Sequence, residues 1–255
     1  MHPVTGRHHP ELGFTNPKVQ RLRRLLGRRS SRSDEGVFVV EGRLLIDEAI
    51  NAGWAVESAY VAAGLDPIDG ADGVPIYVLA PGVAERVSDV EAPSGLFAVV
   101  TERPALVETL RAASFVVVAD RVAEPGNLGT IIRSAEAAGA DAIVVTPGTV
   151  DPSSPKALRS SAGALFHVPI IGAQLAAVAD AGLRLIGTSS HVGTPHTAAD
   201  WTGRIAIVAG NEAAGLDVEG PIDHWVRIEH RGRTESLNVA MATTVLCFEA
   251  ARHRR

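Results

Sequence analysis

The chain has 255 residues, of which 46% are hydrophobic and 21% charged, enough for one large domain or two small ones with a buried core. This composition excludes intrinsic disorder, collagen and coiled coil. The longest apolar runs, such as residues 115–119, have the length of a strand and fall far short of the roughly 20 residues that cross a bilayer. We therefore expect no membrane partner. The start of the chain lacks the pattern of a secretory signal, and the single cysteine, Cys247, can form no internal disulfide, so a cytoplasmic location is expected.

The net charge is −5, but the basic residues are unevenly distributed. Between Leu12 and Ser33 there are seven basic residues and no acidic ones. They are Lys18, Arg21, Arg23, Arg24, Arg28, Arg29 and Arg32. A local cluster of this kind says more about a partner than the sum of charges does.

The first predicted domain is a small α/β unit spanning residues 1–105. Asn16 and Pro17 are typical of a helix start, and apolar residues then recur at helical spacing. The serine-rich run at 30–33 is expected to loosen the end of this helix. Further along, the pattern predicts a strand at 37–40, a helix at 42–52 and strands at 58–62, 76–79 and 96–100.

The second predicted domain spans residues 112–255, after a connector that contains Pro104. We expect strands at 115–119, 142–145, 183–186, 205–209 and 225–228, and helices at 128–138, 156–162, 173–181 and 237–250. Strands alternating with helices predict a mainly parallel sheet covered on both faces. In such sheets ligands bind at the carboxyl ends of the strands.

The loop after the first of these strands contains Asn127, Gly126 and Gly129, with Arg133 one helical turn further on. Glycines let the backbone approach a phosphate or ribose, and free amides at a helix start attract anions. Taken alone, the segment also fits an ordinary tight turn with Arg133 as a solvated surface residue. Fingerprints for dinucleotides and nucleoside triphosphates are absent.

Two later loops carry similarly unusual polar residues. A buried strand runs directly into Gly210, Asn211 and Glu212, where a carboxylate needs a partner or acts as a helix cap. A glycine turn then leads to Ser236, a candidate N-cap, and to Asn238, a poor helix former inside a small, apolar segment.

Together the three segments resemble motifs 1, 2 and 3 of the SpoU-type (TrmH-like) RNA ribose 2′-O-methyltransferases of the SPOUT superfamily. The resemblance consists of N-x-G followed by an arginine, G-N-E-x-x-G-L, and G-x-x-x-S-L-N-V, in order between residues 116 and 250. Residues 16–42 also resemble the ribosomal-protein-L30-like substrate-binding domain attached to many of these enzymes.

The resemblance implies an α/β fold in which a smaller L30e-like α/β domain precedes a SPOUT domain with a trefoil knot. It implies S-adenosylmethionine as cofactor and methyl transfer to a ribose 2′-hydroxyl of structured RNA. By matching position, the cofactor-binding residues would be Thr188, Gly210, Ile228 and Leu237. The catalytic residues would be Asn127, Arg133, Glu212, Ser236 and Asn238.

The resemblance implies that the motif 1 arginine, Arg133, acts as the base, but an arginine side chain is essentially always protonated. We therefore expect Arg133 to grip a phosphate and the forming alkoxide. Glu212 remains a possible proton acceptor, if burial raises its pKa, or a residue that orients others.

The resemblance also gives the basic N-terminal helix a role, with Arg21, Arg24 and Arg28 predicted to contact RNA phosphates. A homodimer is implied in which motif 1 of one subunit lies near the cofactor of the other. We expect 23S ribosomal RNA as substrate, because the appended domain occurs mostly in the ribosomal branch.

One departure and two alternatives remain at this stage. Glu229 and His230 stand where the family usually has Pro-Met, which affects the substrate assignment more than the reaction. The alternatives are a tRNA 2′-O-methyltransferase and a catalytically idle RNA-binding adaptor. No metal is expected, because His8, His9, His191 and His196 show no metal-ligand spacing and are interpreted as surface residues.

Overall fold

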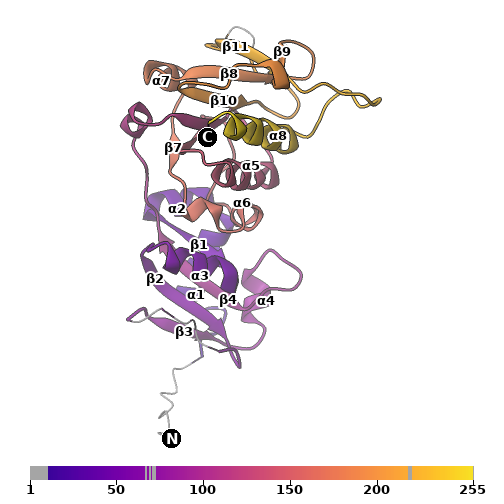
Figure 1. Cartoon of the computed structure of the whole chain (residues 1–255). Helices are drawn as coiled ribbons and strands as arrows, with labels where there is room; N and C mark the ends of the chain where they lie inside the picture. The colour runs from indigo at the N-terminus through magenta and orange to yellow at the C-terminus, as the bar shows by residue number, and fades with distance from the viewer. Residues whose placement is uncertain (1–10, 67, 69, 71–72, 218–219, 255) are drawn as a thin grey trace, which may run out of the picture. The chain divides into compact units, whose positions relative to one another are not determined.

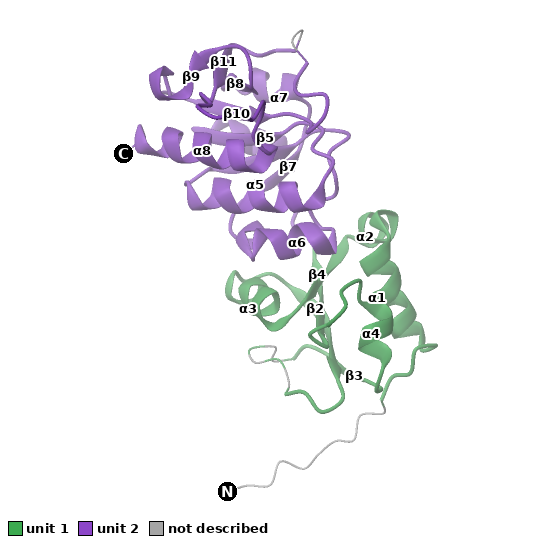
Figure 2. Cartoon of the chain, turned by 90° about the vertical axis from the view of Figure 1, so that its right-hand side faces the viewer, with its two compact units in different colours: residues 1–102 green, residues 103–255 purple. Residues whose placement is uncertain are grey.

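A computed structural model describes residues 11–66, 68, 70, 73–217 and 220–254 (Figure 1). The chain divides into two compact units, Met1–Glu102 and Arg103–Arg255 (Figure 2). The predicted end of the first domain, at residue 105, lies just beyond this division.

Unit 1 contains one mixed sheet of four strands in the order β1-β4-β2-β3, in which only β2 and β3 are parallel. Its strands are β1 (Val37–Glu41), β2 (Val56–Ala62), β3 (Ile76–Leu79) and β4 (Leu96–Thr101). Its helices are α1 (Pro17–Gly27), α2 (Arg29–Glu35), α3 (Arg43–Asn51) and α4 (Val83–Val87).

Alternating apolar residues give the sheet of unit 1 two buried faces. Val37 and Val39 of β1 pack with the buried residues of α1 and α4, such as Leu22 and Val83. Phe38 is buried too and points to the opposite face, because successive strand residues alternate. Figure 2 shows α1 and α4 on one side of the strands and α3 on the other.

The serine-rich run after α1 forms a second helix, α2, where we expected only a loosened helix end. Its Arg32 is buried and donates hydrogen bonds to the carbonyl oxygens of Leu25 (2.6 Å) and Leu26 (3.3 Å). These carbonyls lie in the last turn of α1, where helices leave acceptors unsatisfied. Arg32 therefore stabilises the α1–α2 corner, and Gly36 ends α2 with a left-handed φ of 62°.

Unit 2 contains one parallel sheet of seven strands in the order β7-β6-β5-β10-β8-β11-β9, which confirms the predicted fold class. Its strands are β5 (Phe115–Ala119), β6 (Ala142–Val145), β7 (Ile170–Gly172), β8 (Arg184–Ser189), β9 (Thr194–Pro195), β10 (Ile205–Ala209) and β11 (His224–Arg227). Its helices are α5 (Pro125–Ala137), α6 (Pro155–Ser161), α7 (Leu175–Asp180) and α8 (Val239–Arg252), with 3-10 turns at Val107–Arg111, Ala164–Phe166 and His196–Ala198. The pattern of the sequence did not predict α4 or the short strands β7 and β9.

Helices cover both faces of the parallel sheet, as the sequence predicted. Val178 of α7 packs on one face against Val116 and Val144, while α5 and α8 lie together on the other. The hydroxyl groups of Ser134 in α5 and Thr244 in α8 are 2.7 Å apart and hydrogen bonded. Among the described residues, no helix is long and apolar enough to cross a membrane.

Candidate active site

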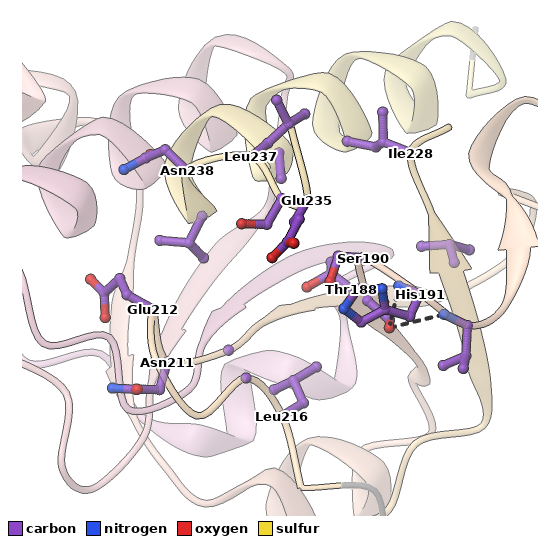
Figure 3. Close-up of a pocket in the computed structure, with 18 of the residues that line it drawn as sticks. Thr188, Ser190, His191, Asn211, Glu212, Leu216, Ile228, Glu235, Leu237 and Asn238 are labelled. Carbon is purple, nitrogen blue, oxygen red and sulfur yellow. Dashed lines mark hydrogen bonds between the residues drawn. The ribbon is translucent and has the colours of Figure 1, made fainter. Parts of the chain in front are cut away.

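The carboxyl ends of three neighbouring strands meet at a pocket in unit 2. β10 pairs with β8, and β8 pairs with β11, all in parallel, so the loops that follow them leave the sheet at one edge. These loops and the start of α8 enclose a cavity of about 600 Å³ (Figure 3). That volume is typical of a small-molecule or cofactor site.

All four residues predicted to hold a cofactor line this pocket: Thr188, Gly210, Ile228 and Leu237. They come from the end of β8, the loop after β10 and the segment between β11 and α8. Leu216 and Leu246 add apolar surface, and Ser189 and Ser190 add hydroxyl groups beside Thr188. Figure 3 shows Thr188, Ser190 and His191 gathered on one side of the pocket, with Glu235 and Leu237 across from them.

Gly210 is required by the path of the loop that follows β10. A Cβ atom at this position would lie 2.7 Å from the backbone of Gly215 and 2.8 Å from Leu216. Such distances are too short for real contacts, so a side chain here would push the loop open. The close return of the chain, fixed also by the hydrogen bond from Gly215 to the carbonyl of Asn211, shapes one wall of the pocket.

The carboxylate of Glu212 is held by groups of the first motif. It accepts hydrogen bonds from the backbone amides of Ala123 (3.0 Å) and Glu124 (3.1 Å) and from the side-chain amide of Asn127 (2.9 Å). Asn211 reinforces the junction by donating to the carbonyl of Arg121. The two loops are thus joined directly, and Glu212 is oriented from three sides.

These contacts set the charge state of Glu212. Partial burial on its own would raise the pKa of Glu212, but the hydrogen bonds from Asn127 and from the amides of Ala123 and Glu124 outweigh it. The net result is a pKa below the usual value for a glutamate. The expectation that burial raises this pKa is therefore wrong, and the arrangement suits an orienting carboxylate better than a proton acceptor.

Asn238 connects the third motif to this network. Its side-chain amide donates to the side-chain oxygen of Asn127 (3.0 Å), and its own side-chain oxygen caps α8 by accepting from the amides of Ala240 (2.9 Å) and Met241 (3.3 Å). The N-cap of α8 is therefore Asn238 and not Ser236. Ser236 is exposed and lines the pocket.

Arg133 lies apart from the other predicted catalytic residues. It is exposed on α5 and is not among the residues that line the pocket. Within the described part of the chain its side chain makes no hydrogen bond or ion pair. Its guanidinium is thus available to a group from outside this subunit.

Sequence reasoning missed two titratable side chains at the pocket. His191, interpreted above as a surface residue, is exposed but lines the cavity, and Glu235 lines it as well. His230, one of the two departures from the family pattern, also lines it, whereas Glu229 points its carboxylate to Arg227 at 3.6 Å. The position of His191 directly after the strand that ends in Thr188 and Ser189 was the available signal.

The basic N-terminal segment is partly neutralised by acidic residues from outside it. Arg21 binds both carboxylate oxygens of Glu57 and one of Glu35, and Arg24 lies 3.9 Å from Glu35. The hydrogen bonds to Glu57 raise the pKa of Arg21 and lower that of Glu57. Arg28 is exposed.

Among the residues that the structure describes, no cluster of three metal-ligating side chains occurs. His8 and His9 lie outside the described residues.

Unit 2 combines a parallel sheet with three loops that form one pocket, and its sequence identifies the family. Residues 114–248 match the model of the SpoU rRNA methylase family, and residues 16–98 match that of the MRM3-like substrate binding domain. The chain belongs to the SpoU rRNA methylase family.

Individual relatives share nearly the whole length. The chain is 33% identical, over 91% of its own length and 95% of the relative's, to 23S rRNA (guanosine(2553)-2′-O)-methyltransferase RlmP of Bacillus subtilis. It is 32% identical to the 23S rRNA (uridine(2479)-2′-O)-methyltransferase of Streptomyces viridochromogenes, over 94% and 91% of the two lengths. The crystal structure of the SpoU methyltransferase AviRb from Streptomyces viridochromogenes, in complex with the cofactor AdoMet, superposes with a TM-score of 0.83 at 31% identity, covering 94% of this chain and 99% of that one.

Proposed function

We propose that this protein transfers a methyl group from S-adenosylmethionine to a ribose 2′-hydroxyl of 23S ribosomal RNA. The observation that carries the proposal is the convergence of all three motifs on one site: Glu212, Ser236 and Asn238 line the pocket, and Asn127 joins Glu212 to Asn238. The 23S rRNA substrates of both named relatives support the choice of RNA. On the basis of a ribosomal substrate we also propose a cytoplasmic location.

The pocket has the chemistry that the cofactor needs. Apolar side chains of Leu216, Ile228 and Leu246 offer a surface for a purine ring, and hydroxyl groups such as that of Thr188 can bind ribose and carboxylate oxygens. Glu235 supplies a negative charge for a cationic ligand. When bound, the cofactor supplies an electrophilic methyl group on a sulfonium.

The residues of this chain would then orient the attacking hydroxyl. In the reaction the 2′-oxygen forms a bond to the methyl carbon as the carbon–sulfur bond breaks, and the hydroxyl proton is released. Arg133 would hold a phosphate and stabilise the oxyanion through its planar donors. Glu212, Asn127 and Asn238 would fix the relative positions of the three loops, and Ser236 would contact the ribose.

We propose a proton acceptor other than Glu212, because the oxygens of Glu212 already accept hydrogen bonds and its pKa is lowered. The titratable side chains that remain in the lining of the pocket are His191, His230 and Glu235. These three replace Glu212 as the residues to test for the base.

We further propose that the protein acts as a homodimer through α8. Met241, Val245 and Phe248 are 64%, 41% and 51% exposed and are spaced so that they share one face of the helix. A contiguous apolar stripe of this kind usually marks an interface. A dimer would also bring the exposed Arg133 of one subunit to the pocket of the other, which its own subunit does not do.

Methyl transfer can be tested directly with purified protein, methyl-labelled S-adenosylmethionine and unmodified 23S rRNA, with tRNA as the parallel substrate. Incorporation into 23S rRNA, mapped as one 2′-O-methylated nucleotide, supports the proposal. Incorporation into tRNA alone selects the tRNA alternative. Binding of the cofactor without transfer to either RNA contradicts the proposed enzyme, and tight RNA binding without cofactor binding identifies an adaptor.

A further inference from the structure

Two arginines of unit 1, neither of them part of the ion pairs of Arg21, converge on the ring of Phe14. The guanidinium carbon of Arg86 lies 3.6 Å from the centroid of the ring, and that of Arg23 lies 5.5 Å from it. Both distances are within the range of cation–π attraction. Arg23 belongs to α1 and Arg86 to α4, two helices that pack side by side on one face of the sheet (Figure 2).

The fold fixes the ring between the two helices. Leu12 pairs with β3 through hydrogen bonds of 2.7 Å to Val78 and 3.0 Å from Ala80, and Gln20 donates to the carbonyl of Phe14. These hydrogen bonds fix the backbone of Phe14 beside the edge strand β3. The buried positions of α4, which include Val83 and Val87, turn Arg86 outward.

The pair of arginines carries an uncompensated positive charge. Arg23 and Arg86 are both exposed, and in the described part of the chain neither forms an ion pair with a carboxylate. Two cations held beside one ring repel each other, and an anion placed between them removes that repulsion. The ring fixes the planes of the guanidinium groups while their N–H donors stay available to an oxyanion.

We propose that Phe14, Arg23 and Arg86 form a binding site for the phosphate backbone of the RNA substrate. This inference rests on the proposed function, which supplies RNA as the partner. Two guanidinium groups lie near the Phe14 ring, so the site offers cationic donors to phosphates. It therefore contributes affinity and salt dependence without reading sequence.

The site also changes which arginines of unit 1 are expected to bind RNA. Arg21 is tied to two carboxylates, whereas Arg86 lies outside the basic segment of the sequence and Arg23 lies within it. We therefore expect RNA to bind those arginines of unit 1 that have no acidic partner, whether or not they belong to the cluster in the sequence.

The test uses the full-length protein and unmodified 23S rRNA, with the dissociation constant measured by filter binding across a range of KCl concentrations. Arg23→Gln and Arg86→Gln should each reduce the slope of log affinity against log salt by about 0.7 to 0.9, and the double variant by roughly twice as much. Arg43→Gln, which removes the same charge from α3 on the other face of the sheet, is the matched control and should leave the slope unchanged. Phe14→Leu, which keeps the apolar packing and removes the aromatic face, should weaken RNA binding.

Four further results separate the possible outcomes. Unchanged cofactor binding by the double variant shows that unit 2 is intact. If wild-type protein binds and methylates the RNA but the double variant keeps the wild-type slope, or if Arg43→Gln lowers the slope equally, the phosphate site is wrong and the proposed function stands. If wild-type protein neither binds nor methylates RNA, the proposed function fails. Competition by poly-glutamate as effective as that by RNA would also overturn the site, because it would indicate an acidic protein partner.

Discussion

The side-chain amide of Asn238 donates a 3.0 Å hydrogen bond to the side-chain oxygen of Asn127, 111 residues earlier in the chain. The side-chain amide of Asn127 in turn donates to Glu212. Asn127, in the first motif, therefore connects the second motif to the third. Both polar ends of Asn127 are in use, so even a change of one atom alters the connection among the three loops.

Asn127→Asp tests this connection. The substitution replaces the donor to Glu212 with a carboxylate oxygen and places two negative charges side by side. We expect the rate of methyl transfer to fall by about 10²-fold or more, by analogy with the loss of one aligned donor in other active sites. Asn127 does not line the pocket, so the dissociation constant of the cofactor, measured by calorimetry, should change little. A large loss of cofactor affinity at an unchanged single-turnover rate would contradict this role.

Glu212→Gln tests the charge of the network through stability. The lowered pKa means that the ionised carboxylate stabilises the folded state above the pKa of the unfolded chain, near 4.5, and that this stabilisation is lost as the pH falls through the folded-state pKa. The difference in unfolding free energy between wild type and Glu212→Gln should therefore be constant near neutral pH and shrink below about pH 4.5. Urea denaturation at several pH values measures it.

The rate of the reaction gives a second test of Glu212. Because its pKa is lowered, Glu212 stays ionised near neutral pH, and any ionisation seen in the rate between about pH 6 and 9 belongs to another group. That ionisation should persist in Glu212→Gln even where the rate is lower. Its disappearance would restore Glu212 as the proton acceptor.

Arg133→Lys tests the phosphate clamp. Lysine keeps the positive charge and loses the planar pair of donors, so we expect methyl transfer to fall by about 10²- to 10³-fold with little change in cofactor affinity. Single-turnover kinetics with saturating RNA measure the effect. Wild-type kinetics in this variant would contradict the proposed role of Arg133 in the reaction.

Phe248→Lys tests the dimer. A lysine at the C-terminal end of the apolar stripe of α8 would place a charge in the proposed interface, which for an obligate dimer buries about 2,000 Å² or more. Sedimentation should show a dimer for the wild type and a monomer for the variant, and methyl transfer should fall with dimerisation. Glu249→Gln, a neighbour paired with Arg252 and His253, serves as the control. An active wild-type monomer at micromolar concentration would contradict the proposal.

Arg21→Gln tests whether the ion-paired Arg21 stabilises the fold and does not bind RNA. The pairs with Glu57 and Glu35 are partly exposed, so the loss should amount to about 1 kcal/mol or less, seen as a lower thermal midpoint. Arg28→Gln, which removes an exposed charge, should instead weaken RNA binding. The reverse pattern would return Arg21 to the RNA-binding surface.

The sequence by itself predicted most of the helices and strands and the family of the protein. Helix start signals at Asn16 and Pro17, and the apolar runs at 115–119 and 205–209, reflect local preferences and burial that a short window already contains. The three motifs contain Asn127, Gly210, Glu212 and Asn238, and the resemblance to the SpoU family was correct. The trefoil knot and the limits of the catalytic set stay predictions.

Only the tertiary structure decided which groups neutralise or orient one another. The run at 30–33 looked like a helix end, but Arg32 reaches back to the carbonyls of α1 and makes a second helix favourable. Arg21 looked free because its partners Glu35 and Glu57 lie outside the basic segment, and Glu212 looked like a base because its donors lie almost ninety residues away. Charge state and availability depend on distances through space, and a linear pattern does not contain them.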